Sequence, residues 1–163
     1  MLSMTNGTYD PLMELEGSSG NDSLIGTSAD ELLLGQAGDD KLNGAAGNDV
    51  LVGGAGRDTL IGGAGADTFR FSTLQDSYRS SSSVYADLIT DFDGTLDRLD
   101  LSGLGFSALG NGYNGTLLLS YSSTSDRTYL KSFEADASGN RFELGIQGNQ
   151  MSALNPTNIL FSA

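Results

Sequence analysis

The chain has 163 residues, of which 21 are acidic and 8 are basic, so its formal charge is −13. It contains neither cysteine nor histidine, which excludes disulfides, thiolate or histidine metal sites and the Ser–His–Asp machinery. Such an acidic surface repels nucleic-acid phosphates, and no apolar run approaches the roughly 18–20 residues of a membrane helix. We therefore expect no nucleic acid and no membrane as partners, and the composition disfavours an enzyme.

Residues 1–16 precede any regular pattern and are predicted to form a linker or N-terminal extension. They lack the basic and apolar regions of an N-terminal signal peptide. The whole chain contains 23 glycines, far more than a helical domain tolerates. The composition therefore indicates an all-β protein.

Residues 17–70 consist of six consecutive nine-residue units. The first position of every unit is glycine, the sixth is acidic and the eighth is apolar. The apolar residues are Leu24, Leu33, Leu42, Leu51, Leu60 and Phe69. This is the glycine- and aspartate-rich RTX nonapeptide, which predicts a right-handed parallel β-roll with two units in each coil.

In such a roll, residues 18 positions apart stack at the strand spacing of roughly 4.8 Å. Leu24, Leu42 and Leu60 are then predicted to form one inner ladder, and Leu33, Leu51 and Phe69 the facing one. With one large buried side chain per nine residues, this core is thin. We expect that hydrophobic burial alone would not fold it.

The acidic residues of the sixth position are predicted to stack in two columns. Asp22, Asp40 and Asp58 form one column, and Glu31, Asp49 and Asp67 form the other. Like charges at this spacing repel by roughly 1 kcal/mol even in water, whereas a calcium ion between coils would bind carboxylate and carbonyl oxygens. Asp76 and Asp87 are expected to extend the columns, which gives about four to six calcium ions. Binding and folding should then be one event.

Residues 71–163 lack the nine-residue period and are predicted to be a C-terminal β extension of the same module. The polar segment Gln75–Ser83 is expected to be a loop. The predicted strands are Leu88–Phe92, Leu99–Leu101, Thr116–Ser122, Arg127–Phe133, Arg141–Gln147 and Asn158–Phe161. Asp136–Asn140 superficially suggests a calcium loop, but Gly145 replaces the closing glutamate of an EF-hand, so a hairpin turn is favoured.

Several segments resemble known proteins. Gly62–Ser72, Tyr85–Phe92 and Asp97–Phe106 resemble the C-terminal part of RTX exoproteins, which include serralysin-type proteases and mannuronan C-5 epimerases. Leu109–Tyr121 and Thr128–Asn149 resemble the R-module of secreted alginate epimerases. The matching segments run from about Gly17 to Phe161.

The resemblance implies a calcium-binding accessory module without catalytic residues, in which catalysis belongs to a separate module of the parent epimerase. It implies secretion to the extracellular medium by the type I route. The expected partners are alginate or mannuronan and the catalytic and neighbouring R-modules of the parent chain. We expect the module itself to be a monomer.

Binding of a polyuronate requires cations and sugar-stacking rings, because arginine matches carboxylates and aromatic faces stack on sugars. The candidate substrate-binding residues are Arg70, Arg79, Arg127, Lys131, Arg141 and Tyr129. Two alternatives stay open. These arginines could pair with nearby aspartates while the tyrosine fills the core, or the chain could be a calcium-triggered folding and type I secretion module with no polysaccharide affinity of its own.

Overall fold

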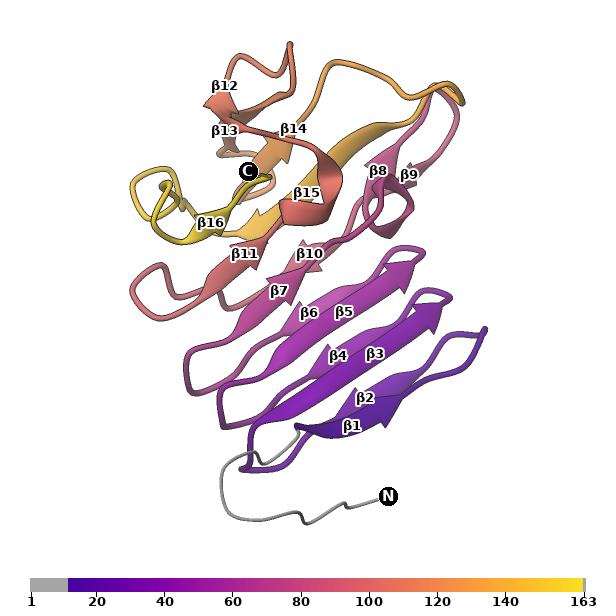
Figure 1. Ribbon diagram of the computed structural model, residues 1–163, viewed down its shortest axis with the longest axis vertical. Coiled ribbons are helices and arrows are strands. Elements are labelled where there is room, and N and C mark those ends of the chain that lie inside the picture. The colour runs from indigo at the N-terminus through magenta and orange to yellow at the C-terminus, as the bar shows by residue number, and fades with distance from the viewer. Residues whose placement is uncertain (1–11, 163) are drawn as a thin grey trace.

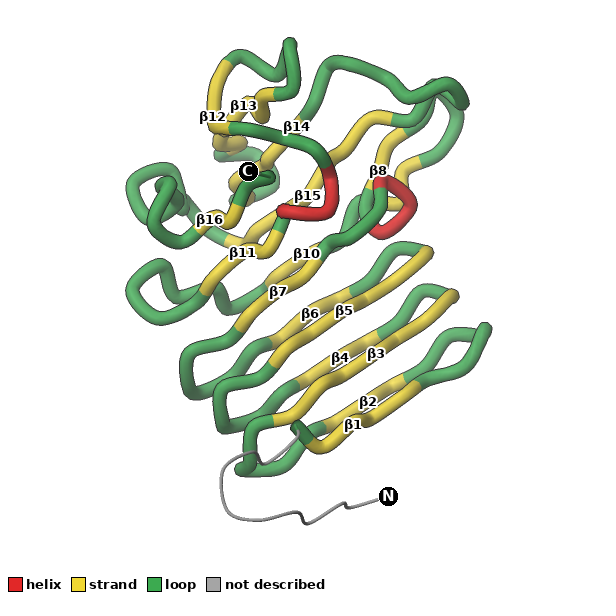
Figure 2. Tube along the Cα trace, in the orientation of Figure 1, coloured by secondary structure: helices red, strands yellow, loops and turns green. Residues whose placement is uncertain are grey.

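The structure is a computed structural model that describes residues 12–162. Two β-sheets face each other along the length of the molecule, and in the roll successive strands alternate between them (Figure 1). Strands dominate, and the described helices are the two short 3₁₀ helices η1 (Leu74–Asp76) and η2 (Ser102–Leu104) (Figure 2). Within residues 12–162 no helix is long and apolar enough to cross a lipid bilayer.

The first sheet has six parallel strands in the order β1-β3-β5-β7-β11-β16. Their bounds are Met13–Glu16, Glu31–Ala37, Val50–Ala55, Thr68–Arg70, Arg98–Asp100 and Ile159–Leu160. Met13–Glu16 pairs in parallel with Glu31–Leu34, so the roll begins at Met13. The predicted linker 1–16 is therefore too long at its C-terminal end, and its first eleven residues lie outside the described residues.

The second sheet has ten strands, eight of them in the order β12-β13-β14-β15-β10-β6-β4-β2. Their bounds are Ala108–Gly110, Thr116–Ser122, Arg127–Lys131, Arg141–Gln147, Leu88–Ile89, Thr59–Ile61, Lys41–Asn43 and Ser23–Ile25. The small strands β8 (Tyr78–Arg79) and β9 (Val84–Tyr85) pair with each other, and β8 also pairs with β15.

The two predicted inner ladders are confirmed. Leu24 pairs with Leu42 and Leu42 with Leu60, while Leu33 pairs with Leu51 and Leu51 with Phe69. From Leu33 to Phe69 these ladder side chains are completely buried, because alternation along each strand points the eighth position into the space between the sheets. The core is as narrow as the repeat predicts.

The C-terminal part continues both sheets. Strand β10 lies between β6 and β15, and β11 lies between β7 and β16, so the ladders extend to Ile89 and Leu99. The sheet then changes from parallel to antiparallel through β13, β14 and β15, which form the predicted hairpins. All six predicted strands are present, although β10, β14 and β16 are shorter than expected. The predicted loop Gln75–Ser83 instead contains β8.

Candidate metal columns and a basic sheet face

The sixth-position carboxylates form two hydrogen-bonded columns. In each column, one carboxylate oxygen accepts the backbone N–H of the acidic residue in the preceding coil, at 2.7–3.0 Å. The first column contains Asp22, Asp40, Asp58 and Asp87, and the second contains Glu31, Asp49, Asp67 and Asp97. Every acidic side chain after the first in each column is thereby fixed in position by the main chain of the preceding coil.

The second oxygen of the carboxylates inside the columns has no partner. Five such Oδ2 atoms are buried without a hydrogen bond within residues 12–162, those of Asp40, Asp49, Asp58, Asp67 and Asp87. A buried, unpaired carboxylate oxygen is costly, because the charge has lost its water and gained no donor. The columns therefore contain acceptor positions aimed at a group that the chain itself does not supply.

The carboxylates at the column ends differ from those inside. Asp22 Oδ2 accepts the N–H and hydroxyl of Ser18, and the Glu31 carboxylate accepts the same two groups of Thr27. At the other end, Asp97 Oδ2 accepts the N–H of Asp93 at 2.8 Å. The free acceptors therefore lie inside the columns, where each carboxylate has a coil on both sides, and at Asp87, the last carboxylate of the first column.

The glycine at the first position of each unit makes room for these free oxygens. A Cβ added at Gly44 would lie 2.2 Å from Asp49 Oδ2, and one at Gly53 would lie 2.3 Å from Asp58 Oδ2. Both distances are far below any normal contact. The invariant spacing of glycine and acid in the sequence therefore has a steric cause.

Protons bind these carboxylates more tightly than usual. Burial, with repulsion from neighbouring carboxylates in addition, raises the pKa of Asp58 to about 7. Burial likewise raises the pKa of Asp49 and of Asp97 to about 6, and it raises the pKa of Asp87 well above its ordinary range. All four pKa values are raised because no positive charge within the described residues compensates these buried carboxylates.

The structure corrects how the columns end. Asp76 was expected to follow Asp58, and Asp87 to follow Asp67. Instead Asp87 follows Asp58 and Asp97, which sequence reasoning missed, follows Asp67. The carboxylate of Asp76 accepts hydrogen bonds within its own turn, from Ser72 and Thr73, although its charge still raises the pKa of Asp58 and Asp87.

The fifth-position side chains also make contacts between coils. Asn21, Asp30, Asp39 and Asn48 accept the N–H of the residue 18 positions later, at 2.7–3.0 Å. They form a second, outer ladder beside the acidic columns. This ladder holds the turns together without using the sixth-position carboxylates.

The donor set suits a hard divalent cation. Calcium takes six to eight oxygens in a flexible shell, and here carboxylates from successive coils stand beside turns rich in backbone carbonyls. Within residues 12–162 no group of three or more acidic side chains forms a compact cluster. Calcium held here would accordingly receive its carboxylates from different coils and its remaining oxygens from the main chain.

Positive charge gathers on the outer face of the ten-stranded sheet. Alternation along the strands places Lys41, Arg127, Lys131 and Arg141 on this face, and Arg79 joins it from β8. Among the strand residues of this face Glu143 is the one carboxylate. A chain of charge −13 thus presents one basic surface.

The structure brings together three of the predicted substrate-binding residues, Arg79, Lys131 and Arg141, which line one pocket. Tyr129 adjoins them, with the Lys131 Nζ 4.3 Å from its ring centroid. Arg127 lies at the other end of β14, and its Nε is buried without a hydrogen bond within the described residues. Arg70 lies apart, on the six-stranded sheet, where its Nε is 3.0 Å from Asp100 Oδ2.

Together, the roll and its columns define a parallel β-roll protein whose acidic nonapeptide repeats fit calcium. The sequence profile of the family described as Peptidase M10 serralysin C terminal matches residues 12–156. The chain belongs to this family, whose RTX-type repeats imply calcium binding. The fold class and the resemblance predicted from the sequence are confirmed.

More specific similarities lie among alginate-modifying enzymes. Mannuronan C5-epimerase AlgE3 of Azotobacter vinelandii is 61% identical over 92 residues, which is 56% of this chain and 5% of that protein. Alginate lyase 7 of the same organism is 58% identical over 79 residues, or 48% of this chain and 9% of the lyase. The matched segment thus covers less than a tenth of the length of either relative.

The similarity to a single module is more complete. The solution structure of the AlgE6R2 subunit from the Azotobacter vinelandii mannuronan C5-epimerase superposes with a TM-score of 0.78 and 49% identity, covering 94% of both chains. This agreement in length and fold supports the R-module resemblance over nearly the whole chain.

Proposed function

We propose that this chain is a non-catalytic, calcium-binding accessory module of an alginate-modifying enzyme, in the first place a mannuronan C5-epimerase. The observation that carries the calcium part is the row of five buried, unpaired Oδ2 atoms in the two columns. The parent activity is inferred from the named epimerases, of which this chain resembles one module. In this proposal the reaction belongs to another module of the parent chain.

The columns offer six inter-coil positions for calcium. On one side they lie between Asp22 and Asp40, Asp40 and Asp58, and Asp58 and Asp87, with Asp76 close to the last pair. On the other side they lie between Glu31 and Asp49, Asp49 and Asp67, and Asp67 and Asp97. The positions that include Asp22, Glu31 or Asp97 have fewer free oxygens, because these carboxylates accept hydrogen bonds within their own turns, so four to six ions is the expected occupancy.

Calcium binding and folding are coupled in this proposal. Without the ion, buried carboxylates in the columns repel each other, and the hydrophobic core between the sheets is thin. The chain would stay unfolded where calcium is scarce, pass an export channel, and fold in the calcium-rich medium outside the cell. Secretion of the related exoproteins supports this order of events.

The basic face of the ten-stranded sheet supports alginate binding. Alginate is a polymer of carboxylate-bearing sugars, and this face carries five cations complementary to it in charge, of which Arg79, Lys131 and Arg141 line one pocket. The catalytic module and neighbouring R-modules are the further partners in the parent chain. The competing function, a folding and export module without polysaccharide affinity, is supported by the columns alone.

One titration separates these two functions. The calcium-loaded module is titrated with short mannuronan oligomers and its amide NMR spectrum is followed, because mannuronan does not gel with calcium. Saturating shifts around Lys131 and Arg141 are expected, and the double variant Arg127→Ala/Lys131→Ala should lose affinity. Arg57→Ala/Arg98→Ala is the matched control, since Arg57 lies in a turn and Arg98 on the other sheet.

A folded, calcium-loaded module that shows no shift at millimolar oligomer would overturn the alginate part and leave the export function. A fold that forms without calcium above pH 7, as followed by circular dichroism, would overturn both functions.

A further inference from the structure

A pocket of about 330 Å³ opens at the edge of the basic face, where β8, β14 and β15 meet. Three cations line it, Arg79, Lys131 and Arg141, together with the aromatic rings of Tyr113 and Phe133. This volume is at the lower end of the range for small-molecule sites, about 300–1,000 Å³. It suits one sugar ring of a longer chain whose neighbours lie outside.

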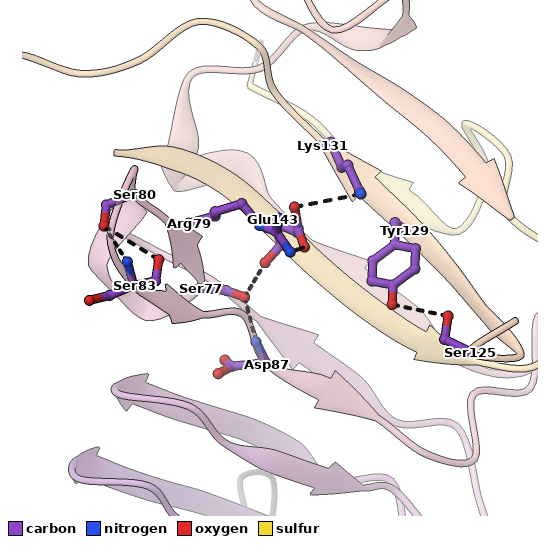
Figure 3. Close-up of polar contacts among 9 residues, drawn as sticks. All are labelled: Ser77, Arg79, Ser80, Ser83, Asp87, Ser125, Tyr129, Lys131 and Glu143. Atoms are coloured by element: carbon purple, nitrogen blue, oxygen red, sulfur yellow. Dashed lines mark hydrogen bonds and ion pairs between the residues drawn. The ribbon is translucent and has the colours of Figure 1, made fainter. Parts of the chain in front are cut away.

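A single carboxylate, Glu143, lies among these cations. It is 5% exposed, and each of its carboxylate oxygens forms an ion pair with a different cation. Oε1 lies 3.0 Å from Arg79 Nη2, and Oε2 lies 3.6 Å from Lys131 Nζ (Figure 3). The strand register explains the placement, because Lys131 of β14 stands directly opposite Glu143 of β15. The acid is therefore a built part of the pocket and not a mobile surface group.

Glu143 divides the cations into two kinds. Arg79 and Lys131 are each partly neutralised by it. Arg141 uses its Nε to donate to the carbonyl of Phe133 at 3.0 Å, and among the described residues no carboxylate lies within ion-pair distance of it. The pocket thus offers one free guanidinium edge for an incoming anion beside a desolvated hydrogen-bond acceptor.

The aromatic wall adds a third kind of contact. Tyr113 is 50% exposed, and its ring packs against that of Phe133 with the centroids 5.3 Å apart. A half-exposed ring held by a second ring is a rigid apolar surface, which suits the C–H face of a pyranose. An inorganic anion has no apolar face that could pack against this ring.

Three complementary features meet only in one class of ligand. A free guanidinium recognises a carboxylate, a buried carboxylate recognises hydroxyl donors, and the aromatic ring recognises the face of a sugar. A sulfate group has no hydroxyl to donate and would be repelled by the Glu143 charge. A hexuronate residue carries all three matching groups.

We propose that this pocket is a subsite for a single hexuronate residue, and that Glu143 determines its specificity by accepting sugar hydroxyls and rejecting anions that lack them. The inference rests on the proposed alginate function and adds to it a defined subsite and a residue that discriminates between anionic ligands.

The test compares two ligands in the calcium-loaded wild type and three variants. The ligands are a mannuronate trimer and sucrose octasulfate, a densely charged sugar without free hydroxyls or carboxylates. Wild type should bind the trimer and discriminate against the octasulfate. Glu143→Gln, which keeps the side chain's shape, should bind the octasulfate about tenfold more tightly, while affinity for the trimer changes much less.

Tyr113→Ala provides the opposite change, because it should weaken binding of the trimer and leave that of the octasulfate nearly unchanged. Glu14→Gln, at an exposed position on the other sheet, controls for the loss of one negative charge. Unaltered calcium midpoints and amide spectra away from the pocket show that each variant is folded.

The outcomes separate the subsite from the wider proposal. Trimer shifts that map outside the pocket, or equal changes for both ligands in Glu143→Gln, would overturn the subsite while alginate binding stands. No trimer binding by the folded wild type would overturn alginate binding and the subsite together.

Discussion

Asp87 Oδ1 accepts the backbone N–H of Asp58 at 2.7 Å across 29 residues, although each earlier rung of its column spans 18. The additional residues leave the roll after β7, form η1, β8 and β9, and return in β10. The column therefore keeps its geometry after the nine-residue repeat has ended. The position of the last carboxylate, and of the calcium ion proposed beside it, depends on where the chain returns and not on the repeat.

The first prediction concerns this last rung. Asp87→Asn should remove the calcium position between Asp58 and Asp87, because the amide can still accept the Asp58 N–H but carries no charge for the ion. Isothermal titration calorimetry should count one calcium fewer than in wild type. A position filled at 100 times its Kd contributes about 2.7 kcal/mol, so stability in calcium should fall by about that amount.

Asp76→Asn is the comparison for Asp87→Asn. Since the Asp76 carboxylate is held by Ser72 and Thr73 within its own turn, its loss should weaken one calcium position without abolishing it. If Asp76→Asn instead cost a full site and Asp87→Asn did not, the column ends assigned here would be wrong.

The second prediction tests the steric requirement for glycine. In Gly44→Ala the new Cβ would collide with Asp49 Oδ2 and with the carbonyl oxygen of Gly62, at 2.2 and 2.7 Å. Crowding of this kind costs about 1–3 kcal/mol, and here it displaces a metal ligand as well. Thermal unfolding in calcium should show the loss of stability, and the calcium midpoint measured by circular dichroism should rise.

Gly20→Ala is the matched control, because the nearest atom to its added Cβ is the Ser18 hydroxyl oxygen at 3.9 Å. Neither glycine has a positive φ, so the two variants differ in available space and not in backbone strain. Gly20→Ala should therefore stay within about 0.5 kcal/mol of wild type. Equal destabilisation by both substitutions would refute the steric explanation.

The repeat predicts the roll well because position in the unit dictates direction in space. The pairing of Leu42 with Leu60 follows from the 18-residue period and the alternation of a strand. The same period also assigns Arg70 to the six-stranded sheet, since it occupies the ninth position of a unit in the same column as Leu34 and Val52. The prediction that Arg70 binds substrate together with the cations of the ten-stranded sheet did not take the period into account.

Beyond Arg70 the period no longer helps. Asp87, which follows Asp58 in its column, carries the local signal of the repeat, an acid followed two residues later by the buried Ile89. Asp76 carries a similar signal, with Tyr78 two residues later. The choice between them depends on the length of the excursion through η1, β8 and β9, which long-range pairing with β15 decides. Local sequence does not contain that information.

The third prediction is a reversal of pH dependence by calcium. Burial raises the pKa of Asp58 to about 7 and that of Asp49 and Asp97 to about 6, against an ordinary value of 3.8. The folded state without calcium thus retains protons that the unfolded state releases. Stability of the calcium-free protein should be greatest near pH 4 and should be lost as the pH rises through 6 to 7.

With calcium the direction is opposite, because the ion binds the deprotonated carboxylates. For each carboxylate that must lose a proton, calcium affinity should fall about tenfold per pH unit below its pKa. Circular dichroism of the calcium-free protein, and calcium titrations between pH 5 and 8, measure both effects. Flat profiles over this range would show that the carboxyl groups titrate near pH 4.

The fourth prediction links the calcium columns to the pocket. The buried hydroxyl of Ser77 accepts the N–H of Asp87 at 2.8 Å and donates to the carbonyl of Glu143 at 2.6 Å (Figure 3). One side chain therefore joins the last rung of a column to the strand that carries the pocket acid. Ser77→Ala leaves both buried groups unpaired, which costs about 1–3 kcal/mol.

If calcium at this rung orders the pocket through Ser77, the variant should bind the mannuronate trimer several-fold more weakly at limiting calcium and nearly normally at saturating calcium. Saturating calcium fixes Asp87 in position directly. At limiting calcium, the Ser77 hydroxyl is needed to couple the position of Asp87 to the strand that carries Glu143. Trimer titrations at two calcium concentrations measure this difference. Ser125→Ala is the control, because Ser125 contacts Tyr129 on the same sheet face but no column residue. An equal loss at both concentrations would mean that Ser77 only stabilises the fold, and that the columns and the pocket act independently.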